Sequence, residues 1–109
     1  MNKRIAVLST AWNGEHIGSI LRGIWNRAKQ TGDDIFIFNT YGGFQTEKEF
    51  NKCEYHIFDL AMKADIDGII ILSNSIYSTK KLRETVQRFI DSGLACISVE
   101  QDLEGIPFI

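Results

Sequence analysis

Short apolar runs rich in β-branched residues occur four times along the chain, and each run leads into a polar loop. Each of the first three loops is followed by a segment in which apolar residues recur at the three–four spacing of a helix. Strands that alternate with helices indicate parallel pairing and a doubly wound α/β sheet, and 109 residues fit a single domain. The four apolar runs are residues 5–8, 35–38, 69–72 and 96–99.

The spacing between these runs predicts three helices, and glycines mark where the first and third of them end. The first helix spans residues 15–31 and is followed by Gly32, where a C-terminal cap belongs. The third begins at Ser78 or Thr79 and ends at Gly93. The residues expected to face inward are Ile17, Ile20, Leu21, Ile24, Trp25 and Ala28 in the first helix, and Leu82, Val86, Phe89 and Ile90 in the third.

The second helix is predicted to start at Thr46, with Glu49 as its capping-box partner. It follows a strand at residues 34–39 that is apolar throughout most of its length, as expected for a strand covered on both faces. The inward residues of the second helix are expected to be Phe50, Cys53, Ile57, Phe58, Leu60 and Ala61.

Polar and aromatic residues follow the apolar runs, at the carboxyl ends of the predicted strands. In doubly wound sheets, ligands bind outside these ends, where the strand order reverses. Amides and carboxylates pair with hydroxyl groups, and aromatic rings stack on apolar CH faces. The sequence therefore predicts a pocket for a polar small molecule rather than a catalytic centre. The residues at this edge are Trp12, Asn13, Tyr41, Asn74, Tyr77, Glu100 and Gln101.

Most of these residues also have a plainer structural interpretation. Asn13 fits a turn that caps the first helix, and Asn74 with Ser75 fits a cap for the next element. Residues 41–44 fit a flexible turn. Glu100 has the strongest claim to a ligand role, because a carboxylate at the carboxyl end of a central strand needs a partner.

The order and spacing of several segments match one known pattern. These segments are residues 5–13, Arg22-Gly23-Ile24, Asn39-Thr40, residues 66–71, Asp91-Ser92-Gly93, Glu100-Gln101-Asp102 and residues 103–107. Together they resemble the amino-terminal lobe of the type I periplasmic-binding-protein fold. The closer likeness is to the effector-binding domains of lactose-repressor-type transcription regulators, and it covers essentially all 109 residues in order.

This resemblance implies a flavodoxin-like, three-layer α/β/α lobe with strand order 2-1-3-4. In the family, the lobe pairs with a second lobe, and a sugar or similar ligand binds in the cleft between them. Ligand contacts come from the loops after strands one, three and four. Carried over by position, the contact residues are Ser9, Trp12, Asn13, Asn74, Ser75, Glu100 and Gln101, and Tyr41 adds an aromatic ring at the same edge.

The chain departs from the family at three points. Glu100 and Gln101 stand where sugar binders of the family often have an Asp-Arg pair, and this removes a rigid bidentate donor. The chain starts at the first strand without a helix-turn-helix, so we expect no direct contact with nucleic acid. It also lacks a second lobe, and residues 103–109 begin another apolar strand. We therefore expect residues 1–109 to be a single lobe of a longer protein, whose output domain is, for example, a diguanylate cyclase.

The net charge and the hydropathy of the chain argue against nucleic acids and membranes as partners. The formal net charge of −2 offers no basic surface for nucleic acid. No apolar stretch approaches the ~20 residues of a membrane span, and the run after Arg4 is too short for a signal peptide. We expect a cytoplasmic protein that does not bind membranes. Cys53 and Cys96 lie in apolar segments and are expected to be buried free thiols.

Signatures of enzymes, cofactors and metals are missing from the sequence. The loop at residues 9–14 has too few glycines for a phosphate loop, and neither G-x-G-x-x-G nor G-x-S-x-G occurs. His16 and His56 are forty residues apart on different predicted helices, so surface positions are favoured over a metal site. We expect no catalytic activity, no cofactor and no metal in this lobe.

These observations favour a ligand-sensing lobe. It would bind a small polar, sugar-like metabolite between two lobes and pass their closure to an output domain, in transcription regulation or signalling. We expect it to act in a homodimer. The alternative is a protein–protein interaction or dimerisation module without a small ligand, in which Trp12, Tyr41, Phe44 and Tyr77 face protein. A small enzyme on the same scaffold is the least favoured function.

Overall fold

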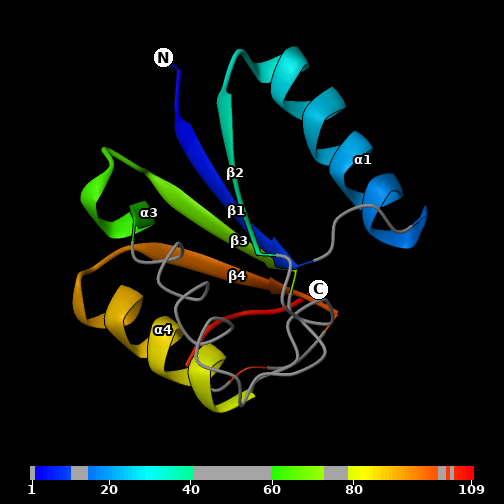
Figure 1. Ribbon diagram of the computed structural model, residues 1–109. Helices are drawn as coiled ribbons and strands as arrows, with labels where there is room; N and C mark the ends of the chain where they lie inside the picture. Colours follow the sequence, from blue (N-terminus) through cyan, green and yellow to red (C-terminus); the bar gives the residue numbers. More distant parts are fainter. Residues whose placement is uncertain (1, 11–14, 41–59, 73–78, 101–102, 104) are drawn as a thin grey trace.

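A four-stranded parallel sheet forms the centre of the molecule (Figure 1). The computed structural model describes residues 2–10, 15–40, 60–72, 79–100, 103 and 105–109. The strands are β1 (Arg4–Thr10), β2 (Asp34–Thr40), β3 (Gly68–Leu72) and β4 (Ala95–Val99). Their order is β2-β1-β3-β4, which confirms the predicted order 2-1-3-4. The strand order therefore reverses between β1 and β3.

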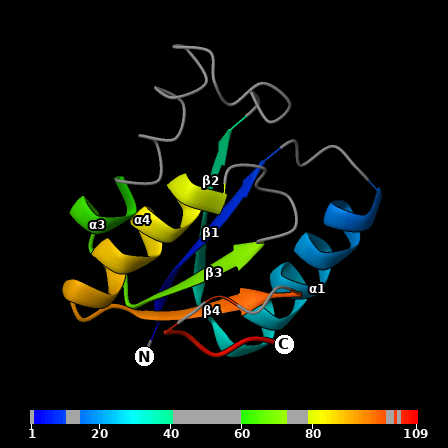
Figure 2. The same cartoon turned by 90° about the horizontal axis from the view of Figure 1, so that it is seen from below.

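Helices cover both faces of the sheet. Helix α1 (Glu15–Thr31) lies on one face, and α3 (Leu60–Lys63) and α4 (Thr79–Asp91) lie on the other (Figure 2). This is the predicted three-layer α/β/α arrangement. The bounds of α1 are those predicted, and α4 begins at one of its two predicted starts. The predicted second helix lies outside the described residues as far as Asp59.

The main hydrophobic core lies between the sheet and helices α3 and α4. Side chains along a strand alternate between the two faces, so every second residue of β1 and β3 points into this core. Phe89 of α4 is fully buried and is the largest of these side chains. The buried core residues are Ala6, Leu8, Ala61, Ile66, Ile69, Ile71, Val86, Phe89 and Leu103.

The face of the sheet beside α1 is packed more openly. Of the residues of α1, all of which are described, Ala28 alone is buried. A cavity of about 580 Å³ lies between the helix and the sheet, and its lining includes Ile24 and Ala28 of the helix and Ile70 and Ile97 of the sheet. Its remaining lining includes Gly68, at the amino end of β3, so the cavity lies toward the amino ends of the strands.

Four apolar residues that were predicted to be covered are exposed instead. Trp25 of α1 is 55% exposed and Leu60 of α3 is 50% exposed. The prediction that both faces of the second strand are covered is also wrong, since Phe36 is 36% exposed and Ile37 is 50% exposed. β2 is the outermost strand on its side of the described sheet, and an apolar pattern does not reveal which strand is outermost.

Two glycines end the helices, as predicted. Gly32 and Gly93 both have φ near +77°, in the left-handed region that glycine adopts without steric cost. The N–H of Gly32 donates to the carbonyl oxygen of Ala28 at 2.8 Å, and that of Gly93 donates to Ile90 at 3.0 Å. These bonds satisfy carbonyl groups that a helix end otherwise leaves without partners.

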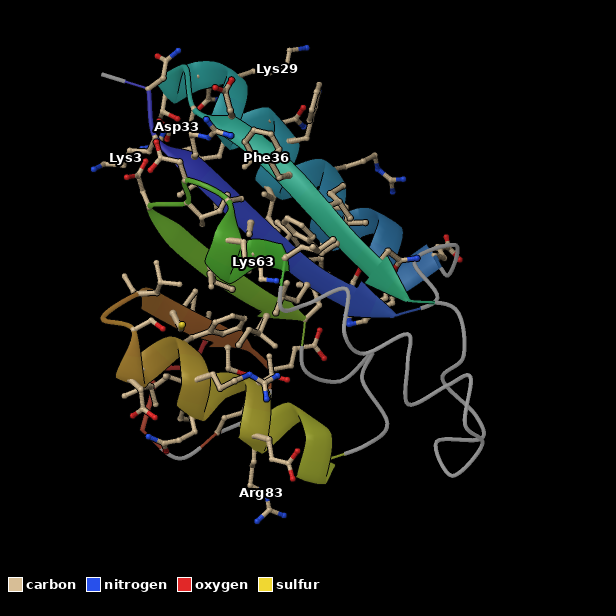
Figure 3. All side chains as sticks on the ribbon, turned by 60° about the vertical axis from the view of Figure 1, so that its left-hand side comes forward. Lys3, Lys29, Asp33, Phe36, Lys63 and Arg83 are labelled. Atoms are coloured by element: carbon tan, nitrogen blue, oxygen red, sulfur yellow. The ribbon has the colours of Figure 1, made fainter. Side chains whose placement is uncertain are left out.

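Two aspartates fix the start of β1. Asp33 Oδ1 accepts the main-chain N–H of Lys3 at 2.9 Å, and Asp67 Oδ2 accepts that of Arg4 at 2.8 Å. Lys3 and Asp33 lie close together at this end of the sheet (Figure 3). The Arg4 guanidinium lies over the ring of Phe36, 4.9 Å from its centroid. These contacts hold β1 in register at its amino end, opposite the edge that carries the candidate site.

The last residues of the chain run beside β4 (Figure 2). Phe108 pairs with Ser98 in parallel orientation. The N–H of Ser98 donates to Pro107 at 2.9 Å, and the N–H of Ile109 donates to Ser98 at 3.0 Å. The segment therefore begins the further strand that the sequence predicts, on the outer side of β4.

Candidate functional site

The carboxyl ends of the strands gather at one edge of the sheet (Figure 1). Ser9 of β1 and Asn39 of β2 lie at this edge, and Glu100 directly follows β4. Helix α1 begins close by, because it follows β1 in the chain, and its second residue is His16. The strand order reverses here between β1 and β3, which is where doubly wound sheets bind ligands.

Ser9 and Asn39 form a polar pair across β1 and β2. The two residues are partners in the parallel register, and the Ser9 hydroxyl donates to Asn39 Oδ1 at 2.8 Å. Ser9 is fully buried and Asn39 is partly buried. Because Asn39 Oδ1 accepts the hydrogen bond from the Ser9 hydroxyl, the NH₂ group of the same amide points away from Ser9. Ser9 therefore sets the orientation of a neighbouring side chain, and Asn39 was not among the predicted ligand contacts.

Glu100 has an unusual backbone conformation. Its φ is +80°, and it is the one non-glycine residue with positive φ in the described part of the chain. The left-handed region costs an ordinary residue about 1–2 kcal/mol. Its N–H donates to the Ile109 carbonyl oxygen at 2.8 Å, so the segment beside β4 helps to hold this conformation.

The Glu100 carboxylate pairs with His16 across 84 residues of sequence. The contact joins Glu100 Oε1 to His16 Nε2, and the ring nitrogen donates because a carboxylate only accepts. The His16 side chain is 69% exposed and that of Glu100 is 32% exposed. His16 thus lies at the start of a helix and near the surface, as predicted, but its contact with Glu100 was not predicted. The sequence signal for it was the need of Glu100 for a partner.

The structure describes two of the eight predicted ligand contacts. Ser9 and Glu100 lie at the same edge, on strands separated by β3. To them the structure adds Asn39 and His16. The other predicted contacts lie outside the described residues: Trp12, Asn13, Tyr41, Asn74, Ser75 and Gln101.

Two hollows of the described structure lie away from this edge, and the one beside α4 is about 340 Å³ and is lined by Arg83, Val86, Gln87, Ile90, Leu103 and Gly105. The cavity beneath α1 is lined mainly by aliphatic side chains and lies toward the opposite edge of the sheet. Among the described residues, no three His, Cys, Asp or Glu side chains are placed to hold a metal ion. Cys96 is a free, half-buried thiol, and burial raises its pKa to about 11, which keeps it protonated and weakly nucleophilic. Cys53 lies outside the described residues. No helix in the described ranges has the length and apolar character that crossing a bilayer requires.

The sheet order, the parallel register and the helices on both faces define one lobe of the type I periplasmic-binding-protein fold, as the sequence resemblance implied. Three solved structures illustrate the match. A solute-binding protein of an ABC transporter from Mycobacterium smegmatis, with bound glycerol, is 13% identical, and the match covers 100% of this chain and 35% of that one at a TM-score of 0.76. A solute-binding protein from Agrobacterium vitis, with bound α-D-tagatopyranose, is 18% identical. The match covers 94% of this chain and 31% of that one at a TM-score of 0.73.

The third is a regulator of transcription. The LacI-family regulator CcpA from Weissella paramesenteroides, with bound sucrose, is 16% identical, and the match covers 97% of this chain and 35% of that one at a TM-score of 0.72. The chain thus spans about a third of the length of each of these proteins. No protein-family model and no curated protein sequence matches the chain. At these identities the structural likeness establishes the fold.

Proposed function

We propose that this chain is one lobe of a sugar-binding sensor, and that its ligand binds at the carboxyl edge of the sheet. The observation that carries the proposal is the His16–Glu100 pair, which places a carboxylate and its donor at the point where the strand order reverses. A carboxylate accepts hydrogen bonds from sugar hydroxyls, and Asn39 adds an amide at the same edge of the sheet, at the end of β2.

The bound molecules of the structural neighbours support the class of ligand. Proteins with this fold are described with bound glucose, sucrose, tagatose and 5-methylthioribose. All four ligands present several hydroxyl groups together with apolar CH faces. The proposal extends this chemistry to the present chain, with Glu100 as the central acceptor and with Trp12, Asn13, Tyr41, Asn74, Ser75 and Gln101 as further contacts.

The lobe would act by closure onto a second lobe. A ligand that contacts both lobes favours the closed state by its difference in affinity for the two states, and an attached output domain responds to that shift. We include in this proposal a homodimeric assembly, a binding rather than a catalytic role, and a cytoplasmic location. Cell fractionation distinguishes this location from a periplasmic one.

Ligand binding by the full-length protein tests the proposal. Thermal-shift measurements with D-glucose, sucrose and D-tagatose should give a saturable increase in melting temperature for at least one sugar. A sugar at 100 times its dissociation constant adds about 2.7 kcal/mol of stability. Glu100→Ala should abolish the shift, whereas Asp65→Asn, which removes a carboxylate from an exposed turn before β3, should keep it. A flat response to all three sugars, or a shift that Glu100→Ala leaves intact, contradicts the proposal.

A protein-contact module is the second candidate, and exposed apolar side chains favour it. Trp25 is 55% exposed on α1 and Ile37 is 50% exposed on β2. The aromatic residues on which this alternative was first based, Trp12, Tyr41, Phe44 and Tyr77, lie outside the described residues. If Trp25→Ser dissociates an oligomer measured by sedimentation, and the sugars give no thermal shift, protein contact replaces sugar binding as the proposed function.

A further inference from the structure

We propose that His16 is a positioning residue of the sugar site, which holds the Glu100 carboxylate in the orientation that accepts a ligand hydroxyl. This inference rests on the proposed function and adds a residue to its site. His16 lies outside the predicted set of contacts, and it was expected to be a surface histidine.

The backbone of Glu100 is the first observation behind this proposal. A φ of +80° favours glycine, yet the chain has a glutamate there and thus accepts the steric cost of a side chain. Three glycines of the described chain have φ between +77° and +91°, at turns where no side chain is needed. The contrast indicates that the carboxylate of Glu100 has a role that glycine does not fill.

The way in which Glu100 is held is the second observation. Its N–H donates to Ile109, which fixes the main chain, and His16 Nε2 contacts Oε1, which fixes the carboxylate. A hydrogen bond to an ionised group is shorter and roughly twice as strong as a neutral one. The side chain of Glu100 is therefore oriented before a ligand arrives, which lowers the entropic cost of binding.

The place of the pair in the fold is the third observation. His16 is in the first turn of α1, which follows β1, whereas Glu100 follows β4. The contact spans the edge above β1, β3 and β4, and it brings the carboxylate beside the amino terminus of α1, where the helix macrodipole favours negative charge. A carboxylate has about four acceptor positions, so a hydrogen bond from the imidazole does not exclude one from a ligand hydroxyl.

A variant series at His16 in the full-length protein tests this role. The probe is whichever of D-glucose, sucrose and D-tagatose binds the wild type most tightly, and the readout is the dissociation constant by calorimetry. His16→Leu removes the donor and should weaken binding about tenfold, the effect of one lost charge-assisted hydrogen bond. His16→Gln keeps an N–H donor at similar reach and should restore binding to within about threefold of the wild type. Lys29→Leu, in the exposed last turn of the same helix, serves as the control and should bind like the wild type.

A double-mutant cycle distinguishes positioning from a general structural effect. In a Glu100→Gln background, which weakens but need not abolish binding, His16→Leu should have little further effect on the dissociation constant, because the charged partner is already gone. Equal dissociation constants for His16→Leu and the wild type, or tighter binding by the variant, would overturn the role of His16 and leave the proposed function intact. If none of the three sugars binds to the wild type, the proposed function fails, and this inference fails with it.

Discussion

The Ser9 hydroxyl donates to Asn39 Oδ1 at 2.8 Å, so the carboxyl ends of β1 and β2 are joined by side chains as well as by the main-chain ladder. Ser9→Ala should lower the free energy of unfolding by about 1 kcal/mol, because the Asn39 acceptor loses its donor. Urea denaturation measures this loss. In an Asn39→Ala background the same substitution should cost markedly less, and equal costs in the two backgrounds would show that the pair contributes no coupling energy.

Glycine should be better tolerated than alanine at position 100. Both substitutions remove the carboxylate, but alanine keeps a Cβ at a φ of +80° and glycine does not. We expect the free energy of unfolding of the Glu100→Gly variant to be about 1 kcal/mol higher than that of the Glu100→Ala variant. In helices and strands the alanine variant is the more stable one, since glycine there lowers the stability of the protein by about 0.5–1 kcal/mol relative to alanine. Denaturation of the two variants side by side therefore reports directly on the backbone of residue 100.

The cavity beside α1 leaves room to stabilise the protein. Gly23 lies within this helix and lines the cavity, and a Cβ added to it meets no atom within 4 Å. Gly23→Ala should raise the free energy of unfolding by about 0.5–1 kcal/mol, because alanine is the better helix former.

A second glycine supplies the matched control for this substitution. A Cβ added to Gly93 also meets no atom within 4 Å, but this residue has a φ of +77°. Gly93→Ala should therefore destabilise the protein by about 1 kcal/mol. The same sign of effect at both positions would contradict the assignment of their backbone conformations.

The contacts of Asp33 make stability depend on pH in acid. The hydrogen bond from the Lys3 main chain, followed by that from the Thr31 hydroxyl, lowers the pKa of the Asp33 carboxyl below its ordinary value of 3.8. A carboxyl whose pKa is lower in the folded state stabilises that state above its unfolded pKa. This contribution is lost as the pH falls below 3.8 and through the lower folded value.

Denaturation between neutral pH and pH ~2 checks this dependence. Asp33→Asn should unfold with a smaller dependence on pH than the wild type in the acid range. Thr31→Val removes the smaller of the two hydrogen bonds that lower the pKa of Asp33. The pH dependence of its unfolding should lie between those of the wild type and Asp33→Asn. If the slopes of all three proteins coincide, Asp33 does not control acid stability.

The alternation of elements could be predicted because it depends on local spacing. The apolar residues of α1 recur at helical intervals between polar ends, and Gly32 and Gly93 stand where the two helices stop. The helical spacing and the terminal glycines can each be recognised from residues that are close together in the sequence. The sheet order came instead from the family resemblance, because strand neighbours far apart in the chain leave little trace in local spacing.

Contacts between distant segments escaped the prediction for the same physical reason. The pairing of His16 with Glu100 depends on the angle at which α1 leaves β1 and on the left-handed turn after β4. The Ser9–Asn39 pair requires the register of two strands that are separated by a helix. The exposure of Ile37 follows from the position of β2 in the sheet, which its apolar sequence does not encode.

The segment beside β4 also affects how copies of this lobe could aggregate. An uncovered strand edge is a template on which strands of other molecules can add. Main-chain bonds among Pro107, Ile109, Ser98 and Glu100 occupy the outer side of β4. In the described sheet this leaves β2 as the outer strand without a strand beside it. Two copies that paired through β2 would form one continuous sheet in which each β2 edge is covered by the other copy.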